Sequence, residues 1–213
     1  MGQIFLVRHG LHSEIGQVLS GRSEIALSQE GERQALALAA MMADVPIASL
    51  HSSPRRRALA TIAPLAAQRR LAVRQSAALD EIDFGAFTGR PFAALADDPA
   101  WARWNAQRGR ARCPGGETMA EAVGRALAYL RSLSPADLPA LCVTHCDIIR
   151  GVLADLDGRN LNRLFDIACD PGSVTTLRVD GSSIRPLSIN VPVRPARLRD
   201  RISPLPDQRR AAR

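Results

Sequence analysis

The sequence contains no lysine, so all 28 of its basic residues are arginine. A Walker-type phosphate-binding loop needs a lysine that reaches the bound phosphates, and the chain therefore cannot form one. The uniform use of arginine in place of lysine is typical of a bias in genome composition rather than of selection for guanidinium groups at particular sites.

Long hydrophobic runs are also absent. No apolar segment approaches the roughly 20 residues that span a membrane, and the first residues lack the basic and apolar regions of a signal peptide. The four cysteines form no Cys-x-x-Cys pair and have no zinc-like spacing to histidine. We therefore predict a cytoplasmic protein with reduced thiols, no membrane partner and no metal site.

The net charge of +7 is concentrated at the C-terminal end. Residues 194–213 contain seven Arg and two Asp, a net charge of +5, which leaves only +2 for the 193 residues before them. We predict a folded domain over residues 1–190 and a basic, proline-rich, solvated tail over residues 191–213. Such a tail can bind RNA, a membrane surface or an acidic partner. Because it lacks interleaved aromatic residues, we expect no nucleic-acid partner.

What is present is the composition of a globular α/β domain. The 213 residues are 46% hydrophobic and 23% charged, which is ordinary for a protein with one packed core. An apolar strand is predicted at residues 4–7, and Arg8, His9 and Gly10 follow it directly. Four apolar residues in a row are typical of a strand buried on both faces of a parallel sheet.

Arg8 and His9 lie where such strands bind ligands, because loops diverge at the strand ends and helix N-termini point into the gap. A guanidinium is a forked donor for phosphate or carboxylate oxygens, and an imidazole is a nucleophile or base near neutral pH. The pair predicts an anion beside a reactive nitrogen. Taken alone, it also fits two side chains that only bond backbone groups at the strand end.

The same pattern recurs later in the chain. Residues 140–144 form a second apolar strand, His145 follows it, and a helix is predicted over residues 148–156. A further strand at residues 47–50 leads to a helix with Ser53 as N-cap and Pro54 as its first residue.

That helix opens with Arg55, Arg56 and Arg57, three cations that oppose the helix dipole. A bound anion would resolve this conflict. The alternative is that the long side chains extend into water, which we expect of Arg55 and Arg56.

Other segments complete the predicted organisation. An acidic loop at residues 79–90 is expected to pack through Ile82, Phe84 and Phe87 with its carboxylates pointing away from the body. A long loop at residues 11–27 is of the kind that carries function. The remaining expected elements are a helix capped by Ser28 that ends near Asp44, a strand at 71–73, a short helix anchored by Trp101 and Trp104, a helix with a Thr118–Glu121 capping box, and a hairpin of 174–179 and 183–189.

Taken in order, these motifs resemble the histidine phosphatase superfamily, which has the phosphoglycerate mutase-like fold. The resemblance spans about residues 4–160. It implies an α/β fold, a three-layer α/β/α sandwich with a mostly parallel central sheet flanked by helices. It rests on Arg8-His9-Gly10, Leu27-Ser28 with Gly31 and Gln34-Ala35, Ser52-Ser53-Pro54 with Arg57-Ala58 and Thr61, Leu79-Asp80-Glu81-Ile82 with Gly85 and Gly89, Gly115-Gly116-Glu117-Thr118, and Val143-Thr144-His145.

The resemblance implies roles for particular residues. His9 would attack phosphorus and become a phosphohistidine, while Arg8, Arg57 and His145 would surround the equatorial oxygens. Glu81 would protonate the leaving oxygen and later take a proton from water. Because the cationic cluster does the work of magnesium in other phosphotransferases, the mechanism needs no metal and no cofactor.

Several nearby residues are assigned less directly. Asp83 is the alternative general acid, and Arg22 is either an additional phosphate or substrate contact or a solvent-facing residue. We expect His12 and His51 to be loop and strand-end residues rather than catalysts. Cys146 either lines the site or packs beside it.

The chain departs from the commoner pattern of the family at three places. Residues 11–15 replace the usual Glu-Thr and Asn after Arg-His-Gly, and Phe87-Thr88-Gly89 stands where Trp-Glu-Gly is common. Cys146 and Asp147 follow His145 where glycines are common. These positions border the leaving group, so the sequence predicts an unusual substrate.

The predicted function is a phosphatase, a phosphomonoesterase acting on a small phosphorylated metabolite. Two alternatives stay open. One is a phosphoglycerate-type mutase that uses the same phosphohistidine, although the compact chain lacks the extra segments that shield such an intermediate. The other is a non-catalytic module that binds a phosphorylated ligand or a partner. The sequence does not indicate an oligomeric state.

Overall fold

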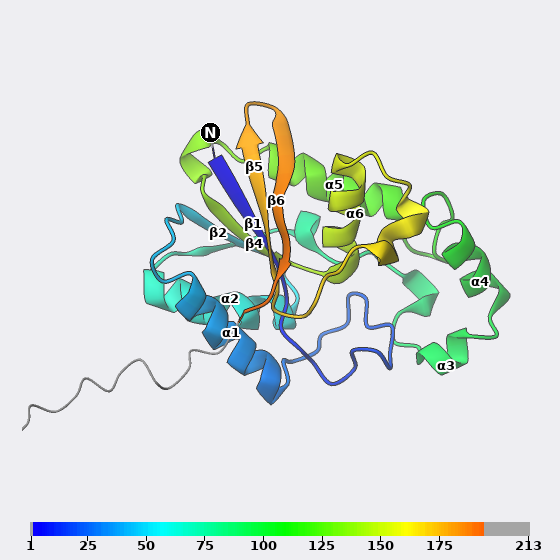
Figure 1. Ribbon diagram of the computed structural model, residues 1–213. Coiled ribbons are helices and arrows are strands. Elements are labelled where there is room, and N and C mark those ends of the chain that lie inside the picture. The colour runs from blue at the N-terminus through cyan, green and yellow to red at the C-terminus, as the bar shows by residue number, and fades with distance from the viewer. Residues whose placement is uncertain (1, 194–213) are drawn as a thin grey trace, which may run out of the picture.

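A computed structural model describes residues 2–193, and it contains one six-stranded sheet with helices on both faces (Figure 1). The strand order is β3-β2-β4-β1-β5-β6. Strands β1 to β4 run parallel, whereas β5 pairs antiparallel with both β1 and β6. The strands are β1 Gly2–Arg8, β2 Ser49–Ser52, β3 Val73–Gln75, β4 Ala140–Thr144, β5 Val174–Asp180 and β6 Ser183–Val191.

Helices cover the two faces of this sheet in pairs, with α1 and α2 on one face and α5 and α6 on the other (Figure 1). Two short helices, α3 and α4, lie beyond the edge of the sheet. The predicted α/β fold is therefore confirmed. The helices are α1 Gln29–Met41, α2 Arg56–Arg69, α3 Phe92–Leu95, α4 Pro99–Ala106, α5 Met119–Arg131 and α6 Cys146–Leu156.

Strand β1 separates two hydrophobic cores because its side chains alternate between the faces of the sheet. Ile4 and Leu6 pack into the core beneath α5 and α6, whereas Phe5 and Val7 pack into the core beneath α1 and α2. Both faces are thus buried, as the unbroken apolar run at residues 4–7 predicts.

The register between β1 and β4 aligns the two functional strand ends. Arg8 is paired with Thr144, and the backbone N–H of His9 donates to the Thr144 carbonyl at 3.0 Å. His9 and His145 therefore leave neighbouring parallel strands at the same level. This alignment brings together two residues that are 136 positions apart in the sequence.

Two predicted helix caps are confirmed. The Ser28 side chain accepts a hydrogen bond from the Gly31 N–H at the start of α1. Thr118 and Glu121 form a reciprocal capping box at the start of α5. In each case a short polar side chain satisfies a backbone donor that the first turn of a helix leaves free.

The predicted start of the second helix is wrong. Helix α2 begins at Arg56, and Arg55 rather than Ser53 occupies its N-cap position. Ser53 instead has its Oγ within hydrogen-bond distance of both His145 and Asp80. Arg55 also differs from expectation, because it is half-buried with its Nε 3.1 Å from an Asp80 carboxylate oxygen. Arg56 is exposed, as expected.

Other element boundaries shift by a few residues. The strands expected at 47–50 and 71–73 lie two residues later, as β2 and β3, and α6 begins two residues before the expected position. The hairpin of β5 and β6 is confirmed, and its second strand extends to Val191. Of the predicted tail at residues 191–213, the part from 194 onward lies outside the described residues.

The acidic loop packs as expected through its apolar residues. Ile82, Phe84 and Phe87 are all buried. Gly85 adopts a positive φ of 52°, and a Cβ there would lie 2.1 Å from the Pro114 carbonyl oxygen. The expectation that all the carboxylates point away from the body is wrong, because Asp80 and Glu81 are buried as well.

No helix among residues 2–193 combines the length and the apolar character needed to cross a membrane.

Candidate active site

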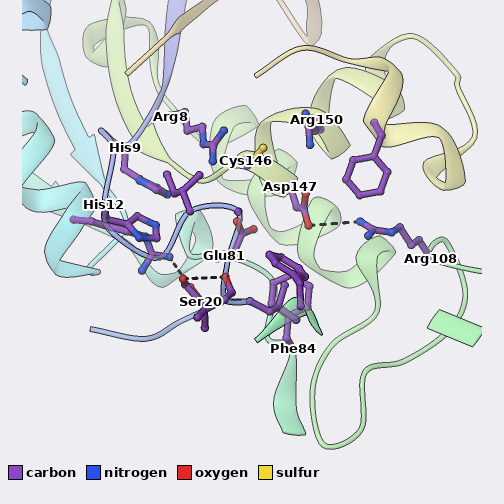
Figure 2. A pocket seen from close by; sticks show the side chains of 18 of the residues that line it. Arg8, His9, His12, Ser20, Glu81, Phe84, Arg108, Cys146, Asp147 and Arg150 are labelled. Atoms are coloured by element: carbon purple, nitrogen blue, oxygen red, sulfur yellow. Dashed lines mark hydrogen bonds and ion pairs between the residues drawn. The ribbon is translucent and has the colours of Figure 1, made fainter. Parts of the chain in front are cut away.

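A pocket opens at the carboxyl ends of β1 and β4, where the parallel strands deliver His9 and where α6 begins (Figure 2). It contains about 750 Å³ of space, part of which is open to solvent. Its charged and imidazole-bearing lining residues are Arg8, His9, His12, Arg57, Glu81, Arg108, Asp147 and Arg150.

The His9 imidazole is held in one orientation by its own backbone neighbour. Its Nδ1 lies 2.9 Å from the Gly10 carbonyl, which can only accept, so Nδ1 carries the proton and Nε2 keeps a free lone pair. The Gly10 N–H in turn donates to Thr61 Oγ1 at 2.9 Å. Burial, followed by the charge of Arg57, holds the pKa of His9 well below its ordinary value. His9 is therefore neutral and oriented, as a nucleophilic imidazole must be.

Arg57 is buried with a relative exposure of 1%. Its guanidinium donates to the carbonyls of Ser23 and Gly21 at 2.8 and 2.5 Å, and to His145 Nδ1 at 3.0 Å. These bonds tie the start of α2 to the long first loop. They also fix a positive charge in the wall of the pocket, where an anion gains the most from it.

His145 lies behind Arg57 rather than in the pocket wall. Its ring centroid is 5.2 Å from that of His9, and its side chain is fully buried. Because Nδ1 accepts from Arg57, the proton is on Nε2, which donates to Ser53 Oγ at 2.8 Å. Burial, followed by the charge of Arg57, lowers the pKa of His145 well below its ordinary value. His145 is therefore neutral in this arrangement.

Ser53 and Asp80 extend this chain of hydrogen bonds. Ser53 Oγ donates to Asp80 Oδ1 at 2.9 Å, and the same carboxylate oxygen lies 3.6 Å from His145 Nε2. Sequence reasoning missed the role of both residues. The Leu79-Asp80-Glu81-Ile82 motif was a signal for Asp80, but its partners come from β2 and β4 and meet it only in the folded chain.

Arg8 lines the pocket beside His9 and donates from Nη1 to the Cys169 carbonyl at 2.5 Å. Arg8, His9 and Arg57 therefore line the same pocket, which contains both guanidinium groups. Cys146 also lines the pocket. Of the two positions expected for it, lining the site or packing beside it, the structure shows the first.

Glu81 faces the same pocket from the acidic loop (Figure 2). Its Oε1 accepts from the Ile82 N–H at 3.0 Å. Burial, followed by the negative charge of Asp147, raises the pKa of Glu81 to about 8. The carboxyl group is therefore protonated at neutral pH and can donate a proton, as a general acid must.

Arg22 does not line the pocket. It donates to the Glu81 carbonyl at 2.9 Å, and its guanidinium lies 3.3 Å from Asp83 and 3.0 Å from Glu117. Arg22 therefore holds the backbone of the acidic loop. The sequence analysis expected either a phosphate or substrate contact or a solvent-facing residue. Asp83 faces Arg22 and likewise lies outside the pocket. Arg125 holds the same Glu81 carbonyl at 2.9 Å.

The other two histidines differ from each other. His51 bonds Ser49 and Tyr129 inside the sheet layer and is a strand residue, as expected. His12, expected to be an ordinary loop residue, lines the pocket with its ring centroid 5.3 Å from that of His9. Burial, followed by the charges of Arg57 and Arg8, lowers the pKa of His12 to about 4.

Sequence reasoning also missed Arg108 and Arg150, which lie with Asp147 at the far end of the pocket (Figure 2). Arg108 comes from the loop after α4 and had no distinguishing sequence pattern. Across residues 2–193, no three His, Cys, Asp or Glu side chains gather in a way that would hold a metal ion.

A buried neutral histidine, a protonated carboxyl group and two guanidiniums thus lie together in one pocket. The sequence model of the histidine phosphatase superfamily (branch 1) matches residues 4–192. The chain belongs to this superfamily, and it is a phosphatase.

Individual relatives share the fold over nearly their whole length. Phosphoserine phosphatase 1 of Hydrogenobacter thermophilus is 24% identical over 90% of this chain and 93% of its own. The structure of a mycobacterial glucosyl-3-phosphoglycerate phosphatase has a TM-score of 0.76 and 25% identity, covering 89% of this chain and 99% of its own. The alpha-ribazole phosphatase of Shigella flexneri has a TM-score of 0.79 and 22% identity, covering 88% and 96%, and supports the fold alone.

Proposed function

We propose that the protein is a metal-independent phosphomonoesterase that hydrolyses a small phosphorylated metabolite through a phosphohistidine on His9. The observation that carries this proposal is the opposite effect of burial on two groups in one pocket. Burial keeps His9 deprotonated and Glu81 protonated at the same pH. A nucleophile and a general acid are therefore ready together.

In the first step, Nε2 of His9 attacks phosphorus in line with the ester oxygen. The P–N bond forms as the P–O bond breaks, and Glu81 delivers its proton to the leaving oxygen. Arg8 and Arg57 offset the charge on the equatorial oxygens, where it collects in the transition state. His145 holds the Arg57 guanidinium through its 3.0 Å hydrogen bond.

In the second step, water attacks the phosphohistidine. Glu81, now a carboxylate, removes a proton from this water as the P–N bond breaks. Inorganic phosphate leaves, His9 returns to its neutral form and Glu81 is protonated again. The positive charge that the step needs comes from two guanidiniums, so no step calls on a metal ion.

The names of the relatives support a small substrate. They refer to phosphoserine and glucosyl-3-phosphoglycerate phosphatases. Residues 11–15 and 146–147, which border the leaving group, differ from the common family pattern. This difference favours a substrate whose leaving group differs from those of other family members.

The test is phosphate release from 4-nitrophenyl phosphate between pH 5 and 8 in the presence of EDTA, with wild type compared with His9→Ala. Activity that persists in EDTA and is lost in the variant supports the proposal. Acid-labile phosphate trapped on His9 identifies the intermediate. Phosphate exchange that depends on a bisphosphorylated primer, with no net release, would instead indicate a mutase.

A further inference from the structure

We propose that Arg108 and Arg150 form a second anion subsite in the pocket, and that this subsite binds a carboxylate on the alcohol part of the substrate. The inference rests on the proposed phosphatase function, and it narrows the substrate class to phosphomonoesters of hydroxy acids. Figure 2 shows Arg8 and His9 at one end of the pocket and Arg108 at the other, with Glu81 and Asp147 between them.

Arg108 is buried and packs against two aromatic rings. Its relative exposure is 4%, and its Cζ lies 4.3 Å from the centroid of the Trp104 ring and 4.1 Å from that of Phe165. These cation–π contacts restrict how the guanidinium can turn. The N–H donors lie on the edge of the group, at the end of the pocket that Arg108 lines.

That edge has unused hydrogen-bonding capacity. Nη2 donates to Asn105 Oδ1 at 2.6 Å. Among residues 2–193, however, neither Nε nor Nη1 of Arg108 has a hydrogen-bond partner, and the Asp147 carboxylate is 3.7 Å from Nη1. A buried guanidinium with two free donors is destabilising. A bound anion would satisfy these donors.

Arg150 provides a second cation on the same wall. It lies on α6, donates from Nε to the Ile167 carbonyl at 2.8 Å, and has its Cζ 5.3 Å from the centroid of the Phe165 ring. It lines the pocket between Arg8 and Arg108 in Figure 2. Its remaining guanidinium nitrogens are therefore available on the side of the pocket opposite Glu81.

The charges in the pocket favour a carboxylate over a second phosphate. Four guanidiniums line it, and with Glu81 protonated and the histidines neutral, Asp147 supplies the one negative charge, which leaves +3. A phosphomonoester dianion contributes −2, so one more negative charge gives a neutral complex. A second dianionic phosphate would leave an excess negative charge beside Asp147, which is unfavourable in a partly dry site.

The experiment compares two substrates that differ at one group. 3-Phosphoglycerate and glycerol 3-phosphate are identical except that the first has a carboxylate where the second has a hydroxymethyl group. We measure kcat/KM for phosphate release from both, and from 4-nitrophenyl phosphate, in wild type, Arg108→Gln, Arg150→Gln and Arg110→Gln. Arg110 is the matched control because it is an exposed arginine two residues away from Arg108.

The wild type should prefer 3-phosphoglycerate by at least about tenfold, the discrimination of one good charge-assisted contact. Arg108→Gln and Arg150→Gln should each reduce this ratio towards one, and Arg110→Gln should preserve it. Because Arg108 is buried, Arg108→Gln can unfold the loop after α4. In that case the test rests on the ratio of kcat/KM for the two substrates in Arg150→Gln.

Two outcomes would overturn the subsite while leaving the phosphatase intact. One is a wild type that hydrolyses both substrates with equal kcat/KM. The other is a folded set of variants in which all three substrates lose activity in parallel. A wild type that releases no phosphate even from 4-nitrophenyl phosphate would instead contradict the proposed function, and the subsite with it.

Discussion

Arg57 donates a hydrogen bond of 3.0 Å to Nδ1 of His145, and this contact sets the protonation of the His145 ring. An arginine cannot accept, so the bond places the His145 proton on Nε2 and keeps the ring neutral. The guanidinium is fixed in turn, because His145 is itself held by Ser53. The positive charge beside His9 is thus positioned before any substrate binds.

Replacing Glu81 with Gln should separate the two chemical steps. Gln cannot donate or remove a proton, so hydrolysis of an alkyl phosphate should fall by about 10²–10⁴-fold. 4-Nitrophenolate leaves without protonation, so this substrate should give a burst of nitrophenol and accumulate phosphohistidine, measured by rapid quench. Asp83→Asn is the control and should show neither effect. A burst in Asp83→Asn but not in Glu81→Gln would assign the acid to Asp83.

The pH dependence of stability should also report Glu81. Its pKa is raised from the ordinary 4.5 to about 8 in the folded protein, so folding favours the protonated form. The contribution of Glu81 to the free energy of unfolding should therefore be greatest below about pH 4.5. It should fall as the pH rises to 8, by at most about 1.4 kcal/mol per pH unit. Urea denaturation at several pH values measures this. Glu81→Gln should lack this component, and identical profiles would contradict a buried, protonated Glu81.

Asp147→Asn should shift the alkaline limb of the kcat/KM profile to lower pH. The negative charge of Asp147 is the second cause, after burial, of the raised pKa of Glu81, so its removal lowers that pKa. The profile is measured with an alkyl phosphate, for which protonation of the leaving group matters. Asp155→Asn, on the same helix but outside the pocket, is the control. An unshifted limb would mean that Asp147 does not influence the acid.

Arg22→Gln should act on stability more than on catalysis. Arg22 binds the carbonyl of Glu81 and the carboxylates of Asp83 and Glu117, and its side chain is 31% exposed. The loss of these contacts should lower the free energy of unfolding by about 1 kcal/mol. The value of KM should change by less than about threefold, because the residue does not face the pocket. A selective rise in KM would restore Arg22 as a substrate contact.

Gly85→Ala should destabilise the acidic loop more than Gly89→Ala. Both glycines have positive φ, 52° and 79°, so both variants carry a similar backbone cost of about 1 kcal/mol. At Gly85 the new Cβ would also meet the Pro114 carbonyl at 2.1 Å, whereas nothing lies within 4 Å at Gly89. The difference in Tm between the two variants measures that clash. Equal Tm values would show that the Pro114 segment moves without cost.

The part of the site carried by parallel strands could be predicted from the sequence. Short apolar runs identify β1 and β4, and the residues after them, His9 and His145, must meet at one edge of a parallel sheet. Ser53 and Asp80 are different, because each has side-chain partners from another segment and its local sequence fits a helix cap or a solvated loop equally well. The Ser53 hydroxyl was therefore predicted as an N-cap.

The loops were less predictable than the strands for a physical reason. Arg22 is placed by carboxylates from two distant segments, at residues 83 and 117, so no local pattern reveals its partners. Arg108 lies in a polar stretch and becomes buried only because Trp104 and Phe165 close on it. Hydrophobic periodicity indicates which face of a helix or strand is apolar. It does not indicate the path that a loop follows in the folded chain.

The pairing of Arg8 with Thr144 has a consequence for how this enzyme can change. The hydrogen-bonded ladder between β1 and β4 sets the spacing of His9 and His145. The far wall of the pocket is formed instead by a loop and the first turns of α6. Exchanging residues such as Arg108 or Phe165 therefore alters which alcohol is recognised without disturbing the spacing at phosphorus. Substitutions in these loops can therefore change the substrate, while the sheet keeps the reacting groups in place.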